Sequence, residues 1–128
     1  MSPYTIEKDE AQVFVEACSE CERVCFETAN HCLAQGGELA DVRGIQLLRN
    51  CARICRTSAA SWNVGSRLYR QVLDACQRLC REAATLCAHR PGDLQLQECA
   101  AECLACADAC ERMADAPRPQ VRSLASPA

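Results

Sequence analysis

The chain has 128 residues, a formal net charge of −3, and only two Phe, two Tyr and one Trp. This length forms one domain that can bury a core without disulfide staples. The negative charge and the scarcity of aromatic rings argue against binding to nucleic acid or to an anionic membrane surface.

Glycine and proline divide the chain into four segments with helical periodicity. The first begins near Thr5 or Asp9 and stops before the glycine pair at residues 36–37. Ser66 and Asp93 are candidate N-caps for the third and fourth segments. We expect helices at about residues 5–35, 39–64, 67–89 and 94–114. Residues 1–114 then form one domain, and the proline-containing residues 115–128 form a disordered tail.

No segment shows the alternation of β-branched residues that is typical of a strand, and the connections between segments are short. Short connections favour antiparallel neighbours. The sequence therefore predicts an all-α fold, an antiparallel up-down-up-down four-helix bundle.

Cysteine recurs at helical spacing on one face of every segment. The fourth segment carries the fullest copy, C-x3-C-x2-C-x3-C from Cys99 to Cys110, and its four side chains fall within a wedge of roughly 60°. A bundle helix normally places Leu and Ile on that face. The thirteen cysteines are Cys18, Cys21, Cys25, Cys32, Cys51, Cys55, Cys76, Cys80, Cys87, Cys99, Cys103, Cys106 and Cys110. Other residues interrupt the pattern at four positions, Thr28, Ser58, Trp62 and Ala83.

Antiparallel threading of this pattern predicts layers of side chains along the inside of the bundle. The first layer holds Cys32, Cys51, Cys87 and Cys99. The second holds Cys55, Cys103, Thr28 and Ala83, and the third holds Cys25, Cys80, Cys106 and Ser58. The fourth holds Cys21, Cys76, Cys110 and Trp62, with Cys18 alone below it.

The predicted tube has one mouth. Its far end is expected to be sealed by apolar bulk from Phe14, Leu73, Tyr69 and Met113. His31 and His89 lie beside the first cysteine layer, where they are candidate metal ligands or an entry gate. The alternative for each histidine is a polar cap or a partner of the helix dipole.

Soft Cu(I) fits this pattern best, because it selects thiolate ligands and accepts low coordination numbers. Two thiolates four residues apart on a helix have Cβ atoms roughly 5–6 Å apart, which suits an S–Cu–S link. If every thiolate bridges two ions, the core stays nearly neutral and holds up to about thirteen ions. A carrier of one ion needs only a pair of cysteines, so the pattern indicates storage without catalysis.

Two other classes of function remain as alternatives. A buffer for Zn²⁺ or another soft metal is one, although thiolates around a few Zn²⁺ ions would leave excess negative charge in the core. An iron–sulfur or thiol redox protein is the other, although the cysteines are spread along helices instead of gathered in a loop.

We expect the protein to be cytoplasmic. The first residues, MSPYTIEKDEAQ, lack the features of a secretory signal, and no apolar stretch reaches membrane-spanning length. An odd number of cysteines in a reducing compartment is not a disulfide framework. A processed secreted protein is the alternative if a leader has been removed.

The C-x3-C-x2-C-x3-C helix, the stretch CARICRTSA from Cys51 and the Gly65-Ser66 start of the third segment resemble the bacterial cysteine-rich four-helix-bundle copper storage proteins. The resemblance covers about residues 11–113. It implies Cu(I) ions inside the bundle, assembly as a homo-oligomer, often a tetramer, and a cytosolic location for members without a leader. The matching positions are the thirteen cysteines, with His31 and His89 less securely placed. A copper chaperone or exporter is an expected partner.

Overall fold

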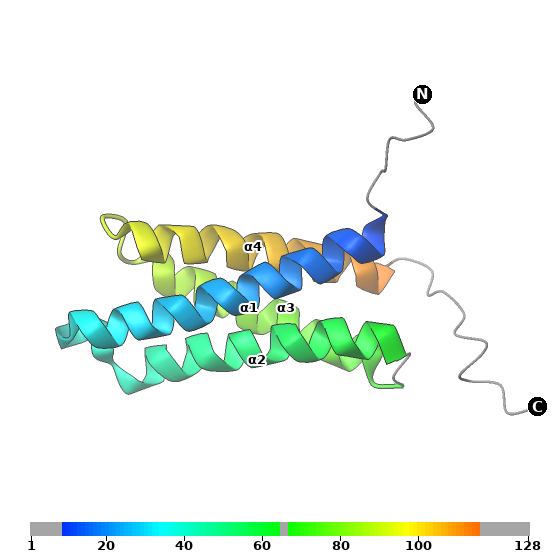
Figure 1. The fold of residues 1–128 in the computed structure, drawn as a ribbon, viewed down its shortest axis with the longest axis horizontal. Helices are drawn as coiled ribbons and strands as arrows, with labels where there is room; N and C mark the ends of the chain where they lie inside the picture. Colours follow the sequence, from blue (N-terminus) through cyan, green and yellow to red (C-terminus); the bar gives the residue numbers. More distant parts are fainter. Residues whose placement is uncertain (1–8, 65–66, 116–128) are drawn as a thin grey trace, which may run out of the picture.

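The computed structural model describes residues 9–64 and 67–115, which form four long helices and no strand. The helices are α1 (Glu10–Gln35), α2 (Val42–Val64), α3 (Tyr69–Ala88) and α4 (Leu94–Asp115), and a short 3-10 helix, η1, spans Gly37–Ala40. Helix α1 packs against α2 and α4, and α3 packs against the same two helices. Successive helices run in opposite directions along the long axis of the molecule (Figure 1). The predicted antiparallel four-helix bundle is confirmed.

Side-chain caps set the starts of α1 and α4. Asp9 and Gln12 form a capping box, in which Asp9 Oδ1 accepts from the Gln12 N–H at 2.8 Å and Gln12 Oε1 accepts from the Asp9 N–H at 3.2 Å. Asp93 Oδ1 accepts from the Leu96 N–H at 3.0 Å. The proposed cap at Ser66 lies outside the described residues.

The connection between α1 and α2 is longer than the sequence predicts. Gly36 and Gly37 have φ values of 72° and 60°, which glycine adopts without strain. The residues after them form η1, and α2 begins only at Val42, where the Asp41 side chain accepts from the Gly44 N–H at 3.4 Å. Both the α1–α2 and the α3–α4 connections lie at one end of the bundle, and the former extends further outward (Figure 1). We call this end the mouth.

Apolar side chains fill the opposite end, as predicted. Phe14, Leu73, Tyr69 and Met113 are all buried there. The Tyr69 hydroxyl donates to the Met113 carbonyl at 3.3 Å, which ties the start of α3 to the end of α4. This end therefore has both packing and a hydrogen bond to hold it closed.

Trp62 is partly buried and packs against the core, and its place in the fourth layer stays a prediction. Its side chain also lines a surface groove with Gln12 and Val15 of α1. The neighbouring Ser61 is buried as well. None of the described helices is long and apolar enough to span a membrane. The expected tail lies outside the described residues, apart from Asp115, which belongs to α4.

Candidate metal centre

All thirteen cysteines are free thiols inside the bundle. Twelve have no exposed surface, and Cys32 is 4% exposed. The helical spacing in the sequence explains this, because the residues of each stripe share one face and that face points toward the bundle axis.

Short sulfur–sulfur contacts join the thiols of different helices. Cys25 Sγ lies 3.5 Å from Cys103 Sγ, and Cys51 Sγ lies 3.6 Å from Cys80 Sγ. Cys55 contacts Cys106 at 3.7 Å and Cys80 at 3.8 Å. Contacts of this kind continue along the tube from Cys99 to Cys18. Ten of the thirteen thiols therefore form one connected column through contacts of 4.0 Å or less, and Cys32, Cys87 and Cys110 make no contact this short with any described thiol.

Three sets of cysteines have sulfurs close enough to share one ion. Within each set, all Sγ atoms lie within 4.8 Å of one another. The sets are Cys21, Cys25, Cys51 and Cys103; Cys21, Cys55, Cys80 and Cys106; and Cys18, Cys106 and Cys110. We call them the upper, central and lower thiol groups, counted from the mouth. Cys21 belongs to the upper and central groups, and Cys106 to the central and lower groups, so the groups are linked.

The spacing within each thiol group suits a thiolate-bound metal. A metal–thiolate bond is about 2.3 Å long in zinc sites, so an ion midway between two sulfurs holds them about 4.6 Å apart. The sulfurs in these groups already lie within 4.8 Å of one another. An ion can therefore be bound with small movements of the side chains, and the helices need not separate.

The predicted layers are wrong in register by about one helical turn on α1 and α2. Cys51 contacts Cys80 and joins the upper group with Cys25 and Cys103, instead of the mouth layer. The helix ends explain this, because α1 ends ten residues after Cys25 and α2 begins nine residues before Cys51. These two cysteines therefore lie at the same height in the antiparallel pair.

Two further positions move for the same reason. Cys21 lies in the centre of the column beside Cys55 and Cys80, and not in the fourth layer. Cys18 is not alone, because its sulfur lies 3.9 Å from Cys106 Sγ in the lower group. The cysteines of α1 consequently lie about one turn closer to the mouth than predicted.

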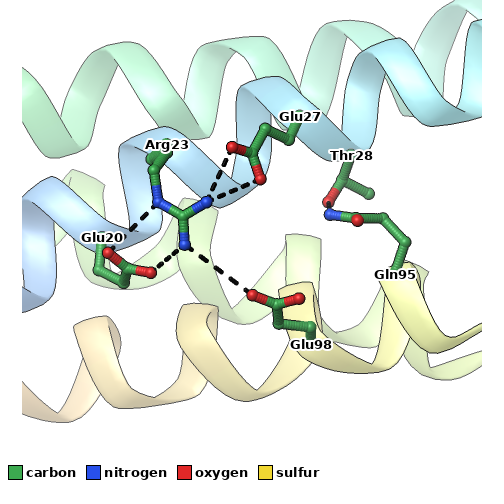
Figure 2. A network of polar contacts seen from close by, with 6 residues as sticks. All are labelled: Glu20, Arg23, Glu27, Thr28, Gln95 and Glu98. Atoms are coloured by element: carbon green, nitrogen blue, oxygen red, sulfur yellow. Dashed lines mark hydrogen bonds and ion pairs between the residues drawn. The ribbon is translucent and has the colours of Figure 1, made fainter.

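The interruptions in the cysteine pattern are buried and occupied by other interactions. The Thr28 hydroxyl accepts from the Gln95 side-chain amide at 2.9 Å, which links α1 to α4 near the mouth (Figure 2). Ser58 donates to the Ile54 carbonyl of its own helix at 2.8 Å. Ala83 has no exposed surface. None of these three side chains extends the thiol column.

At the mouth, the two histidines have different surroundings. His31 Nε2 lies 2.7 Å from Asp93 Oδ2 and so joins α1 to the first turn of α4. His89 is exposed and lines a pocket of about 180 Å³ together with Cys32. An ion pair between Arg90 and Glu38, which also line this pocket, joins the two connections at the mouth.

Sequence reasoning did not identify Glu38, Asp93 or Arg90 as part of the mouth. Asp93 was predicted only as an N-cap, and its contact with His31 joins residues 62 positions apart. Arg90 and Glu38 are exposed charged residues, which in a sequence look like any solvated surface. No local signal would have revealed this pairing.

Burial and hydrogen bonds between thiols shift the pKa values of the cysteines in the column. Hydrogen bonds from Cys103, Cys106 and Cys25 lower the pKa of Cys21. Contacts with Cys106, Cys21 and Cys51, together with burial, raise the pKa of Cys55. Burial also raises the pKa of Cys32, and the nearby Asp93 carboxylate adds to this effect. Neighbouring thiols and burial therefore favour the protonated form at Cys55 and Cys32, and a cation that binds there replaces the proton.

The outer surface carries exposed charged networks and no thiol. Arg23 pairs with Glu20 and with Glu27 on α1 and lies 3.9 Å from Glu98 on α4 (Figure 2). Arg81 similarly pairs with Glu111 at 3.0 Å across α3 and α4. Exposed pairs of this kind contribute little to stability. The cysteines are thus confined to the interior of the bundle and its mouth.

Comparison with known proteins agrees with this geometry. The family model described as Csp, copper storage protein, matches residues 7–115. A crystallised protein from Nitrosospira multiformis is 35% identical, with a TM-score of 0.74, and the match covers 82% of this chain and 94% of that one. Cu(I)-bound copper storage protein BsCsp3 is 26% identical, with a TM-score of 0.76 over 83% of this chain and 99% of that one. Apo copper storage protein 3 from Bacillus subtilis is 28% identical, with a TM-score of 0.71 over 81% and 98%. No curated protein sequence matches the chain.

Proposed function

The chain belongs to the copper storage protein family, and on this basis we propose that it stores Cu(I) on the thiolates inside its bundle. The connected column of thiols carries the proposal. Ten of the thirteen sulfurs are joined by contacts of 4.0 Å or less that cross all four helices, and twelve of the thirteen cysteines have no exposed surface. A soft monovalent ion is the cargo that such a column suits.

Charge sets an upper limit on the cargo. Each Cu(I) ion that displaces one thiol proton leaves the net charge of the buried column unchanged, and this avoids the cost of burying unpaired charge. The limit is then about thirteen ions per chain, one for each thiol. The interruptions at Thr28, Ser58 and Ala83 supply no sulfur, so we expect weaker copper sites beside them.

A Zn²⁺ buffer is less well supported. The central group takes one thiol from each helix and resembles a four-sulfur zinc site. However, linked centres with four thiolates around each Zn²⁺ would accumulate negative charge in a buried column. No such excess arises with Cu(I) at one ion per thiolate.

The test is an anaerobic titration of the fully reduced protein with Cu(I) against a chromophoric Cu(I) chelator. We expect many equivalents to bind before the chelator takes up copper, and we expect the helical circular dichroism spectrum to persist. Saturation after a single ion or a pair would contradict storage. Visible absorption with acid-labile sulfide in the isolated protein would support an iron–sulfur centre instead.

Cu(I) is proposed to enter at the mouth. The opposite end is closed by Phe14, Leu73 and Met113, whereas the mouth has a pocket that reaches a thiol. His89 lines this pocket and is placed to meet an incoming ion, while His31 is held by Asp93. The role is one of storage, without a catalysed reaction.

The setting of the store follows from the free thiols. We propose a cytosolic location, because thirteen free thiols are compatible with a reducing compartment. A copper chaperone or exporter would then exchange ions with the store. We also propose a homo-oligomer, since Phe26 and Leu33 are exposed at 37% and 47% and lie seven residues apart on α1.

A further inference from the structure

Cys32 differs from the other twelve cysteines in its surroundings. It has 4% of its surface exposed, whereas the others have none. It is the cysteine that lines the mouth pocket. Like Cys87, it belongs to none of the three thiol groups and makes none of the sulfur–sulfur contacts of 4.0 Å or less among the described residues, but unlike Cys87 it lines the pocket.

The mouth pocket has room for a small ligand beside this thiol. Its volume of about 180 Å³ equals that of about six water molecules. Leu39, Leu48, Leu86 and Leu96 form apolar walls, and charged groups stand among the lining residues. A single arm of a small thiol fits this space, whereas a folded carrier domain does not.

The thiol column begins near the mouth, the end of the bundle where Cys32 lies. Cys99 is the first cysteine of α4, the helix that begins at the mouth. Burial, the Asp93 carboxylate and Cys99 raise the pKa of Cys32. Cys99 Sγ lies 3.9 Å from both Cys25 Sγ and Cys103 Sγ. Cys99 is therefore the sulfur at which an ion from the mouth joins the column on α4.

We propose that Cys32 is a transfer thiol and not a storage ligand, and that it accepts Cu(I) from a low-molecular-weight bis-thiolate complex in the mouth pocket. This inference rests on the proposed storage of Cu(I). It divides the cysteines into one that moves ions and twelve that hold them.

The transfer conserves charge and oxidation state. The Cys32 sulfur forms a bond to Cu(I), one sulfur–copper bond of the donor complex breaks, and the Cys32 proton moves to the departing thiolate. A second exchange replaces the remaining donor thiol by Cys99, which gives up its own proton to it. A third exchange, with Cys25, returns a proton to Cys32. Copper stays Cu(I), and Cys32 is regenerated.

The test compares Cys32→Ser with Cys76→Ser. Cys76 is a matched control, because it has no exposed surface and its sulfur contacts those of Cys55 and Cys80 at 3.8 Å and 4.0 Å. Uptake from a preformed Cu(I)–glutathione complex is followed anaerobically by the thiolate–copper absorbance, and the bound copper is then counted by competition. We expect Cys32→Ser to slow uptake by about tenfold and to leave the final copper content unchanged. Cys76→Ser should lower the content and keep the rate.

Each other outcome is decisive. If Cys32→Ser takes up copper at the wild-type rate, or loses content as Cys76→Ser does, the transfer role is refuted. If the wild-type chain holds no copper, the storage function fails and the transfer role fails with it. Cys32→Ala, which buries no hydroxyl, repeats the test if the serine variant does not give the helical circular dichroism of the wild type.

Discussion

Replacing Cys21 by serine should cost the protein more copper-dependent stability than any other single thiol replacement on α1. Cys21 Sγ lies 3.8 Å from those of Cys25 and Cys103 and 4.0 Å from that of Cys80. It is shared by the upper and central thiol groups. The substitution Cys21→Ser therefore removes a ligand from two centres at once.

Cys25→Ser is the matched control. Cys25 lies four residues further along the same helix, has the same complete burial and belongs to the upper group alone. A serine hydroxyl in either place costs the apo protein about 1–3 kcal/mol if it stays unpaired. This cost is common to both variants, so it cancels when each variant is compared with and without copper.

The expected difference follows from linkage. A site that is filled at a hundred times its dissociation constant adds about 2.7 kcal/mol to the free energy of unfolding. Cys25→Ser should lose about this amount of copper-dependent stabilisation, and Cys21→Ser about twice as much. Anaerobic guanidinium unfolding with and without Cu(I), followed by circular dichroism, measures both. Equal losses would refute the shared role of Cys21.

Three further predictions concern the mouth. Arg90→Gln breaks the exposed ion pair with Glu38, which is worth about 1 kcal/mol or less, and should therefore speed copper uptake up to about fivefold. Arg81→Gln, far from the pocket, should leave the rate unchanged in the same uptake assay. The hydrogen bond with His31 lowers the pKa of Asp93. The stabilisation that this carboxylate provides is therefore complete at pH values above its ordinary pKa of 3.8, and it is lost as the pH falls through the lower pKa of the folded state. Acid unfolding of Asp93→Asn, which keeps the helix cap, should therefore show a weaker pH dependence in this range. Gly44→Ala should raise the free energy of unfolding by about 0.5–1 kcal/mol, since the added Cβ meets the Leu86 side chain at an ordinary 3.5 Å; a lower midpoint in guanidinium would contradict this.

The sequence could predict which faces of the helices meet but not how far the helices slide along one another. The stripe from Cys99 to Cys110 and the glycine pair after α1 were sufficient for the bundle and for the burial of every cysteine. Register depends on where helices end, and η1 delayed the start of α2 to Val42. An alignment of the segments on their cysteines has no information on that delay.

Long-range pairing limited the prediction of the mouth. A histidine beside a cysteine is compatible with a metal ligand, yet His31 is held by Asp93 at the start of α4, a helix three connections away along the chain. Trp62 agrees better with its helical phase, because it packs against the core and only part of it is exposed in a groove along α1.

The apo bundle is expected to be folded before copper arrives, because large apolar side chains hold it at both ends. Phe14 and Leu73 are fully buried at the sealed end, and Leu48, which lines the mouth pocket, is 1% exposed at the other. The thiols between them are small, weakly polar groups that pack as modest hydrophobes. Zinc fingers, in contrast, have too few apolar residues to fold without metal, so their binding energy is spent on folding. Here the energy of each copper–sulfur bond remains available for holding the ion, and this is what a store requires.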